Sequence, residues 1–251
     1  MRYDTELCRI LAKKQLTKDI FDVTVSAPKL APIAKPGQFA QILVPGKTLR
    51  RPISLCGIGR ETFRLVFQVR GAGTKILSEL QPGEKMDILA PLGKGFPLEG
   101  SATHAVFVGG GIGVPPLLCA AAAFSGERTA VLGFRSKNAA ILADDFAACG
   151  CQVQIATDDG SLGTHGLVTD ILKKQHFDIC YACGPMPMLR AVAKLCAQRK
   201  IPCWISMEQR MACGIGACLG CAVELRREDD SSYYGHVCKD GPVFPADRVV
   251  L

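Results

Sequence analysis

Short runs of alternating apolar and polar residues fill the first hundred positions of the chain. In residues 62–70, every second side chain from Phe63 to Val69 is apolar, which is typical of a half-buried antiparallel strand. Five further runs of similar length are expected to be strands: 8–14, 20–27, 38–44, 52–58 and 85–90. Proline- and glycine-containing turns separate them, and one helix-like segment covers residues 73–80. The pattern predicts a small antiparallel β-barrel.

The pattern changes near residue 100, where expected strands and helices begin to alternate. Residues 104–108 are mostly apolar, as expected for a strand that is covered on both faces. Further strands are expected at 129–134, 152–157, 177–182 and 203–207, and helices at 115–124, 138–148, 166–174 and 185–200. This alternation predicts a doubly wound parallel α/β sheet. The remaining residues are rich in glycine and cysteine and too few for a core of their own. We therefore expect three parts: 1–99, 100–206 and 207–251.

Composition and charge exclude several classes of protein. Of the 251 residues, 48% are hydrophobic and 21% are charged, a balance that excludes a disordered chain. The 30 basic and 23 acidic residues are scattered, so no nucleic-acid partner is expected. The uncharged run 105–124 is interrupted by glycines and prolines, so we expect no membrane span. Because there are 13 cysteines and no signal-peptide pattern, the reducing cytoplasm is the expected location.

Four of the cysteines form the clearest motif in the chain. Cys213, Cys218 and Cys221 follow the pattern C-x4-C-x2-C, and Cys238 comes after sixteen intervening residues. Plant-type ferredoxins bind a [2Fe–2S] cluster through this opening spacing and one distant cysteine, so these four residues are the expected iron ligands. The alternative is a structural zinc site with four cysteines, although zinc ribbons usually carry two C-x2-C pairs and only one is present. The other nine cysteines are expected to be small buried hydrophobic residues.

A glycine-rich turn lies between an expected buried strand and an expected helix: Gly109, Gly110, Gly111, Ile112 and Gly113. Backbone N–H groups at such a helix start favour an anion, for example a pyrophosphate. The turn differs from the usual dinucleotide motif, because Val114 stands where the third glycine is expected. The second strand of the sheet ends on Arg135 and Lys137 instead of an acidic residue. These two residues either bind a 2′-phosphate, which would suit NADP, or are solvated.

Three motifs resemble those of the ferredoxin reductase family. Residues 51–54, Arg-Pro-Ile-Ser, resemble its R-x-x-S flavin motif, and residues 109–116 resemble its nicotinamide nucleotide loop. Residues 183–188, Cys-Gly-Pro-Met-Pro-Met, resemble its C-G-P-x-x-M motif. Together with the four C-terminal cysteines, these motifs occur in the order found in the electron-transfer subunits of class 1B dihydroorotate dehydrogenase. The whole chain therefore resembles that family.

The resemblance implies that the barrel binds FAD, that the α/β part binds NAD and that the cluster faces a partner subunit. The implied FAD contacts are Arg51, Pro52, Ile53, Ser54, Val66, Phe67, Gln68, Gly73 and Thr74. The implied NAD contacts are Gly109, Gly110, Gly111, Ile112, Gly113, Cys183, Gly184 and Pro185. Arg51 would contact the FAD pyrophosphate or ribityl region, Ser54 would hydrogen-bond near the reactive flavin nitrogen, and Cys183 would shape the hydride-transfer site without acting as a nucleophile. Without the resemblance, the residues favour plain surface positions for Arg51 and Ser54. For Cys183, a position in the core and a functional role are equally favoured.

No nucleophilic catalytic set is evident, and the four histidines lack metal-binding spacing, so the chemistry is expected to lie in the cofactors. The resemblance implies an oxidoreductase subunit of pyrimidine biosynthesis. It would pass electrons from an FMN-containing dihydroorotate dehydrogenase catalytic subunit through [2Fe–2S] and FAD to NAD+, in a heterotetramer with two of each subunit. The alternatives are the FAD and [2Fe–2S] subunit of a sulfide dehydrogenase or an NADH-dependent ferredoxin:NADP oxidoreductase, and a non-enzymatic four-cysteine zinc module. Glu208 is expected either near the flavin or on the surface.

Overall fold

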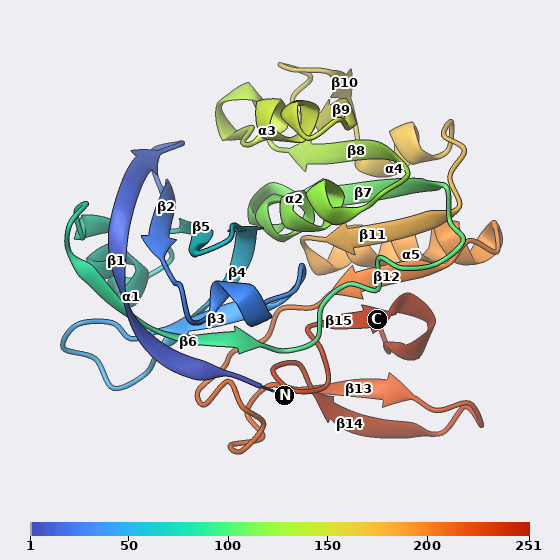
Figure 1. Ribbon diagram of the computed structural model, residues 1–251. Helices are drawn as coiled ribbons and strands as arrows, with labels where there is room; N and C mark the ends of the chain where they lie inside the picture. The colour runs from blue at the N-terminus through green and yellow to red at the C-terminus, as the bar shows by residue number, and fades with distance from the viewer. Residues whose placement is uncertain (1) are drawn as a thin grey trace.

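The computed structural model describes residues 2–251, and its N-terminal part is a closed antiparallel barrel (Figure 1). The strands are β1 (Asp4–Gln15), β2 (Ile20–Ser26), β3 (Phe39–Ile42), β4 (Arg51–Ile58), β5 (Thr62–Gln68) and β6 (Lys85–Leu92). Their spatial order is β1-β2-β5-β4-β3-β6. Helix α1 (Ala72–Glu79) follows β5, and the short 3-10 turn η1 (Ala31–Ile33) follows β2. The barrel that the alternating pattern predicted is confirmed.

Alternate side chains of these strands fill the barrel. Val23 and Val25 of β2 lie opposite Leu65 and Phe63 of β5, and all four are fully buried. The period of two places every second residue inside, which is why a single face of each strand supplies the core. Helix α1 also contributes, because Leu77 is buried in the same apolar cluster.

The second part is a seven-stranded sheet with helices on both faces (Figure 1). Its strands are β7 (His104–Gly110), β8 (Glu127–Phe134), β9 (Gln152–Thr157), β10 (Thr164–His165), β11 (Ile179–Cys183), β12 (Cys203–Ser206) and β15 (Val243–Pro245). Their order is β10-β9-β8-β7-β11-β12-β15, and every pair is parallel except β12 with β15. Helices α2 (Val114–Ala123) and α3 (Ala143–Ala148) pack on one face, and α4 (Val168–Leu172) and α5 (Met186–Gln198) pack on the other. The predicted doubly wound sheet is confirmed.

The expectation of one continuous helix over residues 138–148 is wrong. A 3-10 turn, η3 (Lys137–Ala139), is separated from α3 by Leu142, whose φ is 62°. Ile141 and Leu142 are both buried in the cluster under α2. The positive φ of Leu142 lies outside the right-handed helical region, so the backbone changes direction before α3 begins. The helix expected at 166–174 is also shorter, since α4 ends at Leu172.

The C-terminal segment divides between two structures. Strand β15 extends the large sheet beyond β12, and β13 (Ala222–Arg226) pairs with β14 (Ser232–His236) in a separate hairpin. None of these three short strands was predicted from the sequence. The 3-10 turn η4 (Ala246–Arg248) follows β15. Among residues 2–251, no helix combines the length and the apolar character that crossing a membrane requires.

Helix α2 joins the barrel to the sheet. Cys56 of β4 and Val66 of β5 lie in one buried apolar cluster with Val114 and Leu117 of α2. Burial of such side chains stabilises the interface by roughly 1.5–3 kcal/mol per residue. The strand that carries the predicted flavin motif therefore packs directly against the helix that follows the glycine-rich turn.

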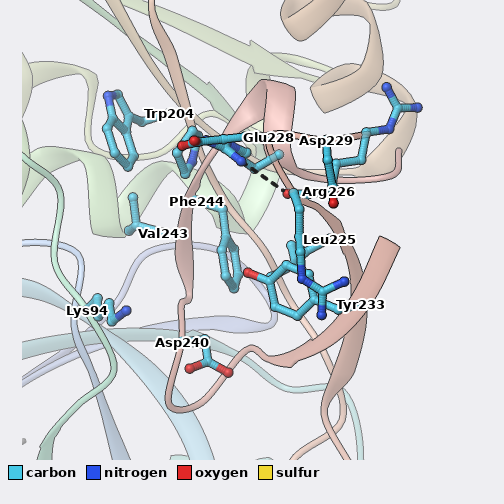
Figure 2. A pocket seen from close by; sticks show the side chains of 13 residues that line it. Lys94, Trp204, Leu225, Arg226, Glu228, Asp229, Tyr233, Asp240, Val243 and Phe244 are labelled. Atoms are coloured by element: carbon cyan, nitrogen blue, oxygen red, sulfur yellow. Dashed lines mark hydrogen bonds and ion pairs between the residues drawn. The ribbon is translucent and has the colours of Figure 1, made fainter. Parts of the chain in front are cut away.

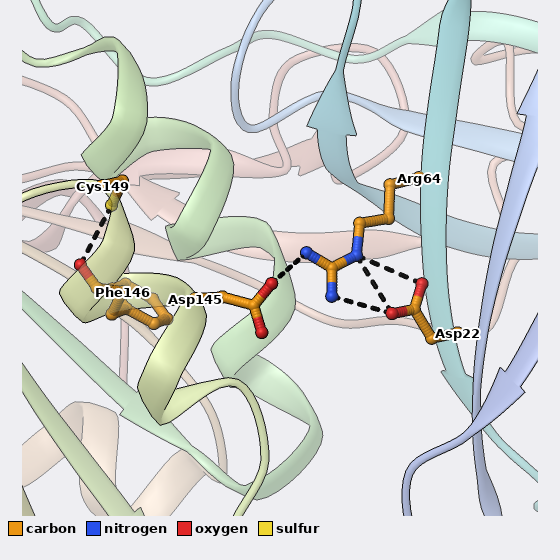
Figure 3. Close-up of polar contacts among 5 residues, drawn as sticks. All are labelled: Asp22, Arg64, Asp145, Phe146 and Cys149. Atoms are coloured by element: carbon orange, nitrogen blue, oxygen red, sulfur yellow. Dashed lines mark hydrogen bonds and ion pairs between the residues drawn. The ribbon is translucent and has the colours of Figure 1, made fainter.

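Arg64 adds a charged contact between the barrel and α3 (Figure 3). Its Nη2 donates to Asp22 Oδ2 at 2.7 Å on the outer face of the barrel, and its Nη1 donates to Asp145 on α3. The hydrogen bonds that Arg64 donates to Asp22 and Asp145 outweigh burial and raise the pKa of Arg64 above its ordinary value. The guanidinium thus remains charged and links the two parts of the molecule.

We expect Arg64→Met to destabilise the fold by roughly 2 kcal/mol, because it leaves the nearly buried Asp22 carboxylate without its cation. For a chain of this size, the temperature of half-unfolding is expected to fall by about 4–8 °C, measured by circular dichroism. Arg60→Met is the matched control, since Arg60 is exposed on the turn between β4 and β5. Equal melting temperatures for the two variants would show that the Arg64 contact does not stabilise the protein.

Candidate functional site

The four predicted iron ligands lie together in the C-terminal segment. Cys213 and Cys218 are on the loop before β13, Cys221 directly precedes β13, and Cys238 follows β14. Because β13 begins opposite the end of β14, the Cys238 N–H donates to Cys221 Sγ at 3.4 Å. Burial, followed by the neighbouring Cys221 and Cys213 sulfurs, raises the pKa of Cys238 to about 12. The two cysteine pairs therefore form one group.

Backbone N–H groups surround the sulfur of Cys213. Its Sγ accepts hydrogen bonds from the N–H groups of Ile215 at 3.5 Å, Ala217 at 3.3 Å and Cys218 at 3.4 Å. Burial by itself would raise the pKa of the Cys213 thiol, but these donors and the Cys218 thiol outweigh it and lower the pKa to about 6. The thiolate is the form that binds metals, and it is favoured here near neutral pH.

This donor set fits an iron–sulfur cluster. All four side chains offer sulfur, and soft thiolates are the usual ligands of such clusters. Gly214 and Gly216 have φ values of 73° and 85°, which turn the loop backbone so that its N–H groups face the sulfur. Cys218 is exposed and Leu219 beside it is 61% exposed, whereas the two ligands next to the hairpin are buried. The group therefore opens to the surface on the Cys218 side.

The predicted diphosphate contacts of the flavin meet at the start of α1. The Arg51 guanidinium lies against Gly73, since a Cβ on Gly73 would be 2.5 Å from Arg51 Nε. Thr74 Oγ1 accepts hydrogen bonds from the N–H groups of Arg70 at 2.9 Å and Gly71 at 3.2 Å, which fixes the first helical turn. A cation and a helix N-terminus thus lie together, and both favour phosphate.

The other predicted flavin contacts lie on two neighbouring strands: Pro52, Ile53 and Ser54 on β4, and Val66, Phe67 and Gln68 on β5. Leu55 of β4 pairs with Leu65 of β5 in antiparallel register, so Ser54 and Val66 lie opposite each other on the two strands. Val66 and Phe67 bury their side chains in apolar cores, so only their backbone is available for a ligand. Gln68 Nε2 donates to Asp19 Oδ2 at 2.6 Å.

The glycine-rich turn packs against the Cys-Gly-Pro motif. A Cβ on Gly113 would be 2.5 Å from the carbonyl oxygen of Cys183, and a Cβ on Gly110 would be 2.8 Å from Pro185 Cδ. A Cβ on Gly184 would be 3.0 Å from Gly110 Cα. These contacts occur where β7 and β11 end, the edge at which doubly wound sheets bind ligands. The structure therefore brings the predicted NAD contacts together, with Gly109 at the end of β7 and the half-buried Gly111 and Ile112 beside it.

The Cys183 thiol lies at this edge in its neutral form. Burial, and then the negative charge of Glu208, raises the pKa of Cys183 to about 12, although a hydrogen bond with Ser206 lowers it slightly. A neutral thiol is a poor nucleophile, so the site offers shape and not covalent catalysis at this position. Glu208 itself is exposed, and its negative charge is close enough to affect the Cys183 thiol.

Some cysteines and basic residues lie apart from these sites. Seven of the nine other cysteines are buried as expected, whereas Cys149 and Cys203 are only half-buried. Cys180, Cys196 and Cys203 hold their sulfurs within 4.8 Å of one another. The sequence carried no signal of this group, because it depends on the packing of β11, α5 and β12. Arg135 and Lys137, at the end of β8, are exposed.

A cavity of about 840 Å³ lies between the β13–β14 hairpin and strands β12 and β15 (Figure 2). Trp204, Tyr233 and Phe244 line it together with Arg226 and Arg248. None of the predicted cofactor contacts is part of its wall. The predicted cofactor contacts at the Arg51 and Gly113 positions therefore lie outside this cavity.

Comparisons with known proteins agree with this arrangement. Residues 208–250 match the family described as the iron-sulfur cluster binding domain of dihydroorotate dehydrogenase B. A protein of Bacillus caldolyticus named dihydroorotate dehydrogenase B (NAD(+)), electron transfer subunit, is 40% identical over 258 residues, covering 98% of each chain. A protein of the same name from Bacillus cereus (strain B4264) is 41% identical over 254 residues, covering 96% of this chain and 97% of the relative.

Solved structures extend the comparison to the fold. The structure of an NADH-dependent reduced ferredoxin-NADP oxidoreductase has a TM-score of 0.87 and 31% identity, and the match covers 97% of this chain and 90% of the other. A ferredoxin reductase of carbazole 1,9a-dioxygenase has a TM-score of 0.67 at 18% identity, covering 80% of this chain and 68% of the other. This second likeness concerns the fold alone.

Proposed function

The chain belongs to the family of dihydroorotate dehydrogenase B electron transfer subunits, and from this we propose that it passes electrons from dihydroorotate to NAD+ within pyrimidine biosynthesis. Dihydroorotate would be oxidised in a separate FMN-containing catalytic subunit, and the electrons would travel through a [2Fe–2S] cluster and FAD held by this chain. The complex would contain two copies of each subunit. The observation that carries the proposal is the group of four cysteine sulfurs within the segment that matches the family.

The cysteines would hold the cluster, and the loop backbone would stabilise its charge. Cys213, Cys218, Cys221 and Cys238 supply the four thiolates, and the three N–H groups at Cys213 Sγ favour negative charge there. Such hydrogen bonds help to set the reduction potential of an iron–sulfur centre. The exposed Cys218 side is the face that a partner subunit would approach, because electrons must enter from outside the chain.

The barrel and the sheet would orient two further cofactors against each other. Arg51 and the first turn of α1 would neutralise the FAD diphosphate, and the Gly109–Gly113 turn would hold the NAD diphosphate. When bound, the flavin exchanges hydride with the nicotinamide as a two-electron carrier and exchanges single electrons with the cluster. Cys183, buried and neutral, would shape the hydride-transfer seam.

A second candidate is the corresponding subunit of an NADH-dependent ferredoxin:NADP oxidoreductase. The structural likeness to that enzyme supports it, and so does the exposed pair Arg135 and Lys137 at the end of β8, where a 2′-phosphate is normally recognised. The higher identity and near-complete coverage of the dihydroorotate dehydrogenase B relatives favour the first proposal. Comparing reduction of NAD+ and NADP+ distinguishes the two.

Isolation of the native complex tests the proposed function. We expect the chain to copurify with an FMN protein, and the complex to reduce NAD+ when dihydroorotate is added. The chain alone, loaded with FAD and cluster, should oxidise NADH with an artificial electron acceptor but should not oxidise dihydroorotate. Copurification with a ferredoxin-linked partner, together with NADP+ reduction and no orotate production, would support the second candidate instead.

A Gly113→Ala variant tests the nucleotide site. The added methyl group would meet the Cys183 carbonyl oxygen at 2.5 Å and Gly184 Cα at 2.6 Å, both of which are backbone and cannot rotate away. We expect the KM for NADH to rise about tenfold or more, equivalent to about 1.4 kcal/mol. FAD content and the cluster spectrum serve as controls and should stay at the wild-type level. An unchanged KM would contradict the assignment of this turn to NAD.

A further inference from the structure

Gln41 of β3 is a buried polar residue without a partner. The residue is 0% exposed, and neither its Nε2 nor its Oε1 makes a hydrogen bond within residues 2–251. Its cross-strand neighbours, Pro52 on β4 and Leu89 on β6, are apolar. Arg50 donates to the backbone carbonyl of Gln41 at 3.1 Å and leaves the side-chain amide unpaired. Buried amides are almost always hydrogen-bonded in proteins, so this one needs an acceptor that the polypeptide does not supply.

The register of β3 determines which way Gln41 points. Ala40 and Ile42 lie in the barrel core, so Phe39 and Gln41 fall on the outer face of the barrel. Phe39 packs in the apolar cluster that also contains Cys221 and Cys238. The outer face of β3 is therefore covered by the C-terminal segment, and Gln41 lies beneath the loop that carries the cluster ligands.

The amide of Gln41 directly contacts this loop at Gly214. A Cβ on Gly214 would be 2.7 Å from Gln41 Cγ and 2.8 Å from Nε2, so only a glycine fits beside the amide. Gly214 immediately follows Cys213, whose sulfur already accepts three backbone N–H groups. The amide nitrogen is thus held at the Cys213 end of the ligand group.

We propose that the Gln41 side chain donates a hydrogen bond to a sulfur atom of the iron–sulfur cluster on its Cys213 side. The inference rests on the proposed cluster, and it adds a residue from outside the cluster segment to its environment. Cluster and thiolate sulfurs are acceptors without hydrogens of their own, which is what an unpaired N–H donor requires. A neutral donor stabilises the more negative, reduced form of the cluster and therefore raises its reduction potential.

The position of Gln41 has a second consequence, which concerns the electron path. It lies on β3, which pairs with β4 at Pro52, one residue from Arg51 and two from Ser54. The cluster loop and the flavin strand are therefore separated by a single strand, and Gln41 contacts the loop from that strand. Loss of the amide should change the reduction potential of the cluster and leave that of the flavin almost unchanged.

The test uses the assembled complex with cluster and FAD loaded. Gln41→Met and Gln41→Leu both remove the N–H donor and replace glutamine with an apolar side chain of similar size. We expect the midpoint potential of the cluster, followed by electron paramagnetic resonance, to fall by about 59 mV, a tenfold change in the one-electron reduction equilibrium. In heavy water, the cluster of the wild type should also show magnetic coupling to an exchangeable deuteron of the Gln41 amide. This one coupling should disappear in the variants, while those of the backbone N–H groups remain.

The matched control is Gln38→Met, because the Gln38 amide is paired within the protein, donating to the Gly93 carbonyl at 2.7 Å. Its cluster potential and deuteron coupling should equal those of the wild type. Wild-type potential and coupling in both Gln41 variants would overturn the inference, as would a change confined to the flavin potential. Absence of the cluster signal from the wild-type protein itself would instead reject the proposed function on which the inference rests.

Discussion

A Cys218→Ser variant is expected to lose the [2Fe–2S] cluster while keeping most of its FAD. In the proposed site Cys218 would supply one of four sulfurs, and its N–H and thiol both stabilise the neighbouring Cys213 sulfur. A serine hydroxyl is not ionised near neutral pH and is a hard ligand that iron–sulfur clusters disfavour. The predicted flavin contacts lie on β4, β5 and α1, away from this side chain. Dihydroorotate-dependent reduction of NAD+ should fall at least about 100-fold.

The measurement combines iron and acid-labile sulfide content with the low-temperature paramagnetic signal of the reduced protein. NADH oxidation with an artificial acceptor, which needs only flavin, should stay close to the wild-type rate. Binding of the catalytic partner should weaken, because Cys218 is on the exposed side of the group. Cys149→Ser is the matched control, since Cys149 is half-buried and its thiol lies apart from the cluster, in contact with the Phe146 carbonyl and with Cys151 Sγ at 3.8 Å. A normal [2Fe–2S] signal in Cys218→Ser would reject the ligand assignment, and zinc in place of iron in the wild type would favour the structural-metal alternative.

The features that could be predicted well are motifs whose residues lie close together in the sequence. The C-x4-C-x2-C run, the period-two alternation around Phe63 and the glycine-rich turn at Gly109–Gly113 each involve neighbouring residues, so local chain geometry fixes what they can form. The barrel and the doubly wound sheet were predictable for the same reason. The contacts of Arg51 with Gly73 and of Gly113 with Cys183 support the residue sets taken from the family, although the cofactor contacts themselves stay predictions.

The features that the sequence missed depend on packing between distant segments. Gln41 and Gly214 are separated by most of the chain, and a lone glutamine within an expected strand carries no signal of its partner. The sulfur group of Cys180, Cys196 and Cys203 likewise arises only when α5 packs on the sheet. Leu142 interrupts an expected helix with a positive φ, and its side chain is buried in the core. In each case tertiary contacts decide a position that local propensity leaves open.

An Arg51→Ala variant is expected to bind FAD about 10- to 100-fold more weakly, because a charge-assisted contact with phosphate is worth about 1.5–3 kcal/mol. The helix N-terminus at Gly73 remains and should retain part of the affinity. Arg51→Lys keeps the charge but loses the forked donor geometry, so an intermediate affinity is expected.

Equilibrium dialysis of FAD and the flavin-to-protein ratio after gel filtration measure the effect of Arg51→Ala. Lys75→Ala is the matched control, because Lys75 is an exposed cation on the same helix, 3.6 Å from Glu79. If the loss of affinity followed only from net charge, both variants would lose FAD equally; a local diphosphate contact predicts loss in Arg51→Ala alone.

Gly73→Ala should also weaken FAD binding. Its added methyl group would lie within 3 Å of the Arg51 guanidinium and would displace it. Full FAD occupancy in both Arg51→Ala and Gly73→Ala would mean that the diphosphate binds elsewhere on the barrel.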